Sequence, residues 1–207
     1  VKKPPLDGGS DIEVTFNWER DKLFDKAAVE ALYSMAQIES NDTVRIKKIA
    51  STRKTKRKPV PLTTVALQKL GTSKLKMSSH DVMKIAEKLY TSGYISYPRT
   101  ETDSFDKTID LRKLINNLSD YSDEKVRNFI QNLSQNGFEN PRSGGHNDQA
   151  HPPIHPVKLA TNLSDQEYKI YNLISRHFLA CCSKDAVGEE TKVVACVGQE
   201  EFTCSGI

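Results

Sequence analysis

The spacing of apolar residues changes twice along this chain. Apolar and polar residues alternate with a period of two near both ends, which is typical of strands with one buried face. A period of 3.6 residues, which is typical of amphipathic helices, fills the centre. Strands are expected at residues 12–18 and 44–50, with a hairpin at 193–197 and 200–204; helices are expected at about 22–37, 64–70, 79–92, 105–118, 123–135 and 164–181.

Local signals mark several boundaries of these elements. Ser164 and Glu167 have the spacing of a capping box, in which each side chain bonds the other residue's backbone at a helix start. Gly93 follows the strongest amphipathic pattern and is expected to end that helix in a left-handed conformation. Residues 138–157 contain four prolines, two glycines and three histidines, and they have no internal period. They are expected to form a long loop, and loops of that length are often functional.

Composition limits the class of protein. The 207 residues are 37% hydrophobic and 28% charged, which suits one large or two small globular domains without a membrane span. The four cysteines lack the C-x-x-C spacing of zinc sites and are interpreted as reduced core thiols of an intracellular protein. The net charge is only +3, but the eight basic residues between Arg45 and Lys58 include no acid between them. This run is expected to be a loop, either a solvated surface or a patch that follows phosphates.

The most distinctive chemistry lies just after Gly93. Tyr97 is followed at once by Pro98 and Arg99. Proline restricts the residue before it to an extended conformation, and in an extended segment Arg99 falls on the same face as Tyr97. A tyrosine hydroxyl has a reference pKa of about 10, so a nucleophilic tyrosine needs a neighbouring cation. This spacing suits a tyrosine that attacks a phosphodiester, although it also fits an ordinary strand tyrosine before a turn.

The run Gly93–Thr102 resembles the active-site signature of type IA DNA topoisomerases, and it most resembles their topoisomerase III branch. The helix before it, Met83–Tyr90, is similar to the family's lead-in. Asp148–Pro156 resembles a second motif of the family, and Arg176–Cys182 is similar as well. The resemblance covers most of residues 12–207, with its motifs in the family's order.

This resemblance implies an α+β fold, in which a mainly helical, helix-turn-helix-like domain that carries the tyrosine is inserted into a β-rich arch domain. On that basis residues 1–70 are the first part of the arch, 71–187 the tyrosine-bearing domain, and 188–207 the return segment of the arch.

The resemblance also implies roles for individual residues. Tyr97 would attack one DNA strand and form a 5′-phosphotyrosyl link, which conserves the energy of the phosphodiester for religation. Arg99 would hold a non-bridging phosphate oxygen, the alternative being a surface ion pair with Glu101 or Asp103. His151 would contact the phosphate near the scissile bond, the alternative being an ordinary loop histidine. Further contacts to DNA are expected from Lys84, Lys88, Ser96, Thr100, Thr102 and His155.

The chain also departs from the family pattern. Complete type IA enzymes carry an acidic, Mg²⁺-binding domain with an Asp-x-Asp-x-Glu cluster, and the acids Asp103, Asp106 and Asp110 lack that spacing. The three histidines of the 138–157 loop do not form a zinc set, because Pro152 and Pro153 break any helix between them. Mg²⁺ is therefore expected only in the complete enzyme, no metal site is expected in this chain, and the chain alone is not expected to relax supercoiled DNA.

The expected partners are single-stranded DNA or also RNA, together with helicase or OB-fold proteins, in the nucleus and without a membrane. A second function class remains open, which is a non-catalytic module that binds single-stranded nucleic acid. The combination of Tyr97, Arg99 and His151 separates the two classes, because a binding module has no need of a tyrosine nucleophile.

Overall fold

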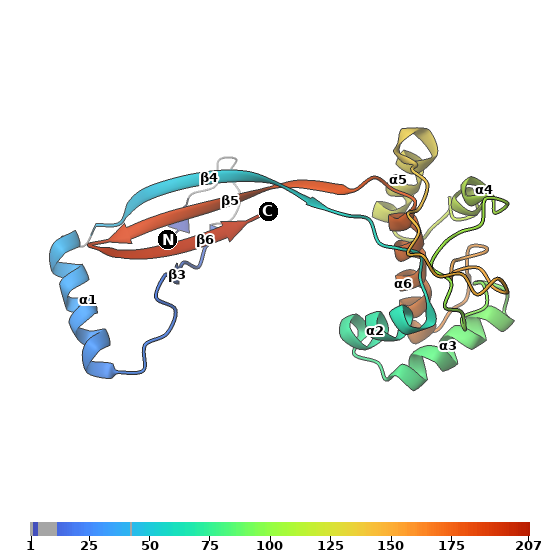
Figure 1. Ribbon diagram of the computed structural model, residues 1–207, viewed down its shortest axis with the longest axis horizontal. Helices are drawn as coiled ribbons and strands as arrows, with labels where there is room; N and C mark the ends of the chain where they lie inside the picture. Colours follow the sequence, from blue (N-terminus) through green and yellow to red (C-terminus); the bar gives the residue numbers. More distant parts are fainter. Residues whose placement is uncertain (1, 4–11, 42) are drawn as a thin grey trace. The chain divides into compact units, whose positions relative to one another are not determined.

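The protein is described by a computed structural model, which covers residues 2–3, 12–41 and 43–207 (Figure 1). The chain divides into two compact units. Unit 1 consists of Val1–Thr55 and Val187–Ile207, and unit 2 of Lys56–Ala186. Unit 1 is built on a sheet and unit 2 on helices, so the α+β class predicted from the sequence is correct.

The sheet of unit 1 has four strands in the order β3-β6-β5-β4. These strands are β3 (Asn17–Trp18), β4 (Arg45–Lys56), β5 (Ala186–Val197) and β6 (Glu200–Gly206). β6 runs antiparallel to both β3 and β5, which confirms the predicted hairpin. The single strand expected at 12–18 is instead two short ones, because β2 (Ile12–Glu13) pairs with β1 (Lys2–Lys3) while β3 pairs with β6.

The helix α1 (Lys26–Ser40) begins later than its apolar pattern suggests. The Asp25 side chain accepts a hydrogen bond from the Ala28 backbone N–H, and this cap fixes the start of the helix. The helix packs on the turn of the β5–β6 hairpin, where Gly198 has a φ of 59°. A side chain at Gly198 would lie 3.0 Å from the Ala36 carbonyl oxygen, so glycine is required both for the turn and for this approach.

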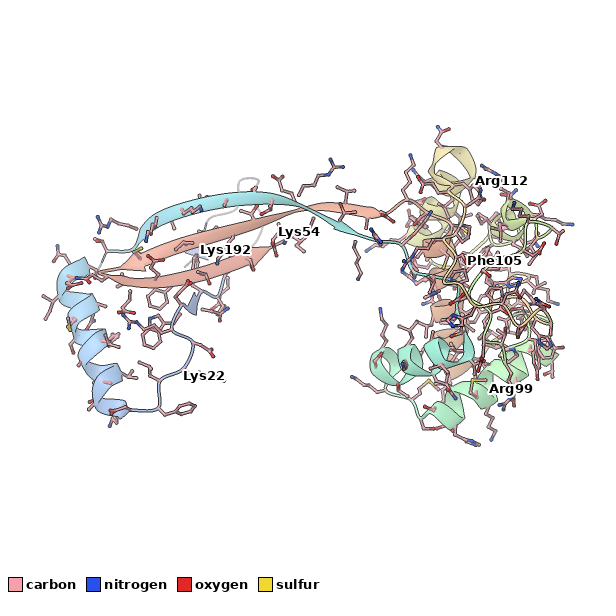
Figure 2. All side chains as sticks on the ribbon, viewed as in Figure 1. Lys22, Lys54, Arg99, Phe105, Arg112 and Lys192 are labelled. Atoms are coloured by element: carbon pink, nitrogen blue, oxygen red, sulfur yellow. The ribbon has the colours of Figure 1, made fainter. Side chains whose placement is uncertain are left out.

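The strand predicted at 44–50 is confirmed as the first half of β4, but the loop predicted for the rest of the basic run is wrong, because the strand continues to Lys56. β4 contains most of the run, and two of its lysines pair with acids on β5, the adjacent strand, and on β6, the strand beyond it. Lys47 pairs with Glu201, and Lys54 pairs with Glu190 at 3.1 Å. Figure 2 shows Lys54 among the side chains of this sheet. Such cross-strand pairs stabilise a strand whose lysine-rich composition alone would disfavour it.

The core of unit 2 lies between α2 (Thr64–Leu75), α3 (Ser79–Thr91) and α6 (Asp165–Cys181). α2 and α3 approach so closely that a methyl group on Gly71 would lie 2.5 Å from Val82 Cγ2. Leu67 on α2 is fully buried in this core. The boundary expected between residues 70 and 71 therefore falls inside a core helix, and the division between the two units lies at residues 55–56 instead.

Two further helical segments are shorter than expected. The helix predicted at 105–118 is only α4 (Leu111–Asn116), because Asp106 accepts hydrogen bonds from the backbone and hydroxyl of Thr108 and holds a turn. Asp110 then caps α4. The helix predicted at 123–135 is α5 (Glu124–Asn132), which continues as a π-helical turn, η1 (Leu133–Gly137).

The long segment 138–157 is a loop, as its composition predicts. Its end is joined to the rest of unit 2 by two isolated antiparallel bridges, between Leu62 and Ile154 and between Ile95 and Pro156. These bridges bring the loop beside the segment that follows α3, and the candidate site is formed there.

Candidate active site

The helix α3 leads into the site. Ser78 caps its N-terminus, and Val82, Ala86 and Leu89 bury its apolar stripe. The helix ends as predicted at Gly93, whose φ is 73°. The N–H groups of Gly93 and Tyr94 donate to the carbonyls of Tyr90 and Leu89, which is a Schellman motif.

The segment after Gly93 is extended and is paired to the end of the loop. The Ser96 N–H donates to the His155 carbonyl at 2.9 Å, and the Val157 N–H donates to the Tyr94 carbonyl at 2.9 Å. Ile95 between them is buried in the core. This pairing fixes the backbone immediately before Tyr97 and places it beside the histidine-containing loop.

Tyr97 is half-buried between two rings. The Tyr90 ring packs against it edge-on, with centroids 5.2 Å apart, and the His151 ring lies 4.6 Å away with the planes tilted by 36°. The structure therefore brings together Tyr97 and His151, although 54 residues separate them in the sequence. The His151 side chain is 43% exposed, so one side of this pair faces solvent.

Arg99 is exposed close to the end of α3 (Figure 2). It pairs with Glu87 of that helix, through Nε at 2.7 Å and Nη2 at 2.5 Å, both to Oε1. The partner is thus neither Glu101 nor Asp103, the two acids considered from the sequence. Glu87 occupies the edge of the guanidinium group that is formed by Nε and Nη2. A bidentate phosphate contact needs two N–H groups on the same edge, so it cannot use this one while Glu87 is bound. The second edge is free of Glu87, and a phosphate oxygen pair could bind there.

Four residues expected to contact DNA are engaged inside the protein. Thr100 and Thr102 are 4% and 2% exposed, and Ser96 Oγ donates to the Pro153 carbonyl. His155 is 5% exposed, its Nδ1 bonds the Pro153 carbonyl, and burial lowers its pKa. These side chains support the backbone of the site, so the structure corrects the prediction that they are surface contacts.

Lys84 and Lys88 are on α3, and both side chains reach solvent. Lys88 pairs with Glu167 at 2.5 Å, and Glu167 also completes the predicted capping box of α6 with Ser164. The ammonium group of Lys88 and the N–H of Ser164 together lower the pKa of Glu167 to about 2. The positive charge of Lys88 is therefore partly neutralised by Glu167 within the protein.

The lowered pKa of Glu167 leads to a prediction about stability. A carboxylate whose folded pKa is depressed stabilises the fold above its unfolded pKa, and this contribution is lost as the pH falls through the folded value. Glu167→Gln should lower the free energy of unfolding by about 1 kcal/mol at pH 7, and the difference from wild type should vanish near pH 2. Chemical denaturation at several pH values measures this. Asp165→Asn, in the same helical turn, should have less than half the effect, and equal effects would contradict the prediction.

The other reactive residues that the structure describes form no further centre. Burial raises the pKa of Cys182 to about 12, so this thiol stays protonated. Asp103 bonds the His146 backbone N–H at 2.8 Å and lies 3.2 Å from its ring. In the parts of the chain that the structure describes, no three His, Cys, Asp or Glu side chains come together as metal ligands.

Asp148 is a site residue that sequence reasoning missed. Its carboxylate accepts the backbone N–H groups of Ala150 and His151 and the Thr100 hydroxyl. These hydrogen bonds hold the pKa of the carboxyl well below its usual range, and the one from the His151 N–H has the largest effect. The only signal in the sequence is an Asp three residues before the loop histidine, at the spacing where Asp caps backbone N–H groups.

The chain is similar to known DNA topoisomerases. A family model described as DNA topoisomerase matches residues 6–207. DNA topoisomerase 3-alpha is 47% identical over 197 residues in Drosophila melanogaster and 44% identical over 194 residues in Homo sapiens, covering 95% and 94% of this chain. Full-length topoisomerase I from Thermotoga maritima has a similar fold, with a TM-score of 0.60, 22% identity and 92% of this chain covered.

The chain therefore belongs to the type IA DNA topoisomerases. Within them it falls in the topoisomerase III branch, as its similarity to the topoisomerase 3 proteins shows. It spans 16% of the fly protein and 19% of the human one, and 31% of the Thermotoga maritima chain. Among the residues described, no helix has both the length and the apolar character to cross a bilayer.

Proposed function

We propose that this chain is the central, tyrosine-bearing part of a topoisomerase III enzyme that transiently cleaves and religates single-stranded DNA. The observation that supports this most is the packing of Tyr97 against His151 within the two motifs of the family. Sequence similarity supports the enzyme class, while the geometry supports these particular residues. A module that only bound nucleic acid would not need a tyrosine beside the histidine at this point.

In the proposed reaction, the Tyr97 oxygen attacks the phosphorus of one strand. A new bond forms between phosphorus and the tyrosine oxygen, and the bond to the 3′ oxygen of the preceding nucleotide breaks. The phenolic proton leaves Tyr97, and the departing 3′ oxygen takes up a proton to become a hydroxyl. Religation reverses these steps. His151 and Arg99 would contact the non-bridging oxygens, where negative charge increases in the transition state.

We further propose that unit 1 is part of the β-rich arch and that unit 2 is the helix-turn-helix-like domain that carries the tyrosine. The helices α2 and α3 of unit 2 pack closely at Gly71 and Val82, as paired helices of such a domain would. This proposal also includes the location and the partners that the family implies. The location is the nucleus, and the partners are helicase or OB-fold proteins and RNA beside DNA.

Binding to single-stranded DNA provides the direct test on this chain. Contacts to phosphates release counterions, so affinity should fall with salt. For a footprint of about four phosphates, affinity should drop roughly fiftyfold between about 50 and about 200 mM salt. Fluorescence anisotropy with a labelled oligonucleotide measures this. Affinity that is unchanged by salt would contradict a phosphate-based interface.

The chain alone should not relax supercoiled DNA. None of its described residues forms a metal cluster, and the family resemblance implies a separate acidic domain for that task. The measurement is to incubate the purified chain with negatively supercoiled plasmid and magnesium, and to look for topoisomer ladders and protein-linked 5′ ends. Relaxation that disappears on Tyr97→Phe would show that the chain is sufficient and that this part of the proposal is wrong.

A further inference from the structure

The segment that delivers His151 lies in a loop without regular structure, so a specific contact must hold the histidine against Tyr97. We propose that Asp148 is the positioning residue that does so, by joining the histidine loop to the tyrosine motif through a single carboxylate. This inference rests on the proposed function, because it assigns Asp148 to the same phosphate site.

The first part of the connection is within the loop. Asp148 Oδ1 accepts the N–H of Ala150 at 2.9 Å and the N–H of His151 at 2.8 Å. Asn147 Oδ1 accepts the N–H of Gln149 at 2.8 Å, and Gln149 has a φ of 58°. These hydrogen bonds turn the backbone sharply just before the histidine. The position of the His151 backbone is thus set by the Asp148 side chain.

The second part connects the loop to the motif. The Thr100 hydroxyl donates to Asp148 Oδ2 at 3.1 Å, and the Asp148 N–H donates to the Thr102 hydroxyl at 2.9 Å. Thr100 itself is held at the start of α2, where its N–H donates to Thr64 Oγ1 at 2.8 Å. Because Thr100 follows Tyr97 by three residues, the same carboxylate joins the backbone of the histidine loop to the Thr100 side chain of the tyrosine motif.

The third part concerns the imidazole ring. His151 Nδ1 lies 3.8 Å from Asp148 Oδ2, which is within reach of an ion pair when the ring is protonated. With Nδ1 on the side of Asp148, the opposite nitrogen, Nε2, is left for another acceptor. A phosphate oxygen is such an acceptor. The hydrogen bonds to Asp148 also keep its carboxyl ionised, because they hold its pKa well below the usual range.

A double-mutant cycle on binding to single-stranded DNA tests the connection. Affinities are measured at low salt and about pH 6 for wild type, Asp148→Asn, His151→Ala and the double variant. In the wild-type background His151→Ala should weaken binding about tenfold, as expected for one charged hydrogen bond to phosphate. In the Asp148→Asn background the same substitution should cost less than about twofold, because the ring is no longer held at the phosphate.

Asp106→Asn is the matched control. Asp106 lines the same polar cavity of about 360 Å³ as His151, but its carboxylate accepts hydrogen bonds from Thr108 and not from the histidine loop. Its removal takes away the same charge without releasing the ring. His151→Ala should therefore still cost about tenfold in this background. An equal reduction in the two Asp backgrounds would mean that charge alone matters, and it would overturn the inference.

A second readout is independent of DNA. The Tyr97 ring should displace the NMR resonances of the adjacent His151 ring, and Tyr97→Leu defines the size of this displacement. Asp148→Asn should remove most of it while thermal unfolding still shows a folded chain. If Asp148→Asn does not fold, Thr100→Val removes one hydroxyl donor to the carboxylate, and Thr100→Ser, which keeps the donor, should restore the displacement.

The outcomes separate the two proposals. If DNA binds and His151→Ala costs the same in the wild-type and Asp148→Asn backgrounds, the positioning role is wrong while the proposed function stands. If His151→Ala has no effect in the wild type, His151 does not contact phosphate. The positioning role of Asp148 is then wrong, and so is the role of His151 in the proposed function. If the histidine resonances keep their displacement in Asp148→Asn, the inference is wrong whatever the DNA result.

Discussion

Replacing Tyr97 by phenylalanine should abolish DNA cleavage in the longer enzyme of which we propose this chain is a part. The substitution removes only the hydroxyl oxygen that would form the bond to phosphorus, so the covalent route is lost. Loss of a nucleophile typically costs about 10⁴-fold or more in rate. Cleavage of a labelled single-stranded oligonucleotide, with detection of the protein-linked 5′ end, measures the effect.

The packing around Tyr97 should survive this change. Phenylalanine keeps the ring that contacts Tyr90 and His151, so binding of single-stranded DNA should change by less than about twofold. Tyr168→Phe is the matched control, because Tyr168 lies 37% exposed on α6 and its hydroxyl is 3.4 Å from that of Ser122. Cleavage by the Tyr168 variant should equal that of wild type. Continued cleavage by Tyr97→Phe would exclude Tyr97 as the nucleophile.

Local signals in the sequence were sufficient for several elements of the fold. The capping box at Ser164 and the helix stop at Gly93 depend on residues a few positions apart, and both are present in the structure. The strand β4 was recognised only in its first half, at residues 44–50. Its second half was predicted to be a loop, because the acid that pairs with Lys54 lies more than a hundred residues later in the chain.

The candidate site, like the fold, could be predicted from the sequence only in part. The meeting of Tyr97 and His151 was predicted from two motifs in the family's order, and their rings are in contact. The family pattern does not reveal which polar residues face solvent. Thr100 and Thr102 are buried because the loop folds over them. Asp148 was not recognised as part of the site, although its carboxylate accepts the Thr100 hydroxyl and its N–H donates to the Thr102 hydroxyl.

The interior that supports this loop also leads to a prediction. Phe178 on α6 is 2% exposed, and its ring lies 5.9 Å from that of Phe105 and 6.1 Å from that of His155. His155 belongs to the segment that pairs with Ser96, directly before Tyr97. Phe178 is therefore the apolar support beneath the paired segments of the site.

Phe178→Ala should lower the free energy of unfolding by about 3–5 kcal/mol, because the lost burial and the remaining cavity both destabilise the folded state. The aromatic contacts with Phe105 and His155 add to this loss. Since domains are commonly stable by only about 5–15 kcal/mol, the variant should unfold at markedly lower denaturant concentration. Phe129→Ala, which removes a ring that is 41% exposed on α5, is the matched control and should cost less than about 1 kcal/mol. Urea unfolding followed by circular dichroism compares the two variants, and equal midpoints would show that Phe178 does not support the core in this way.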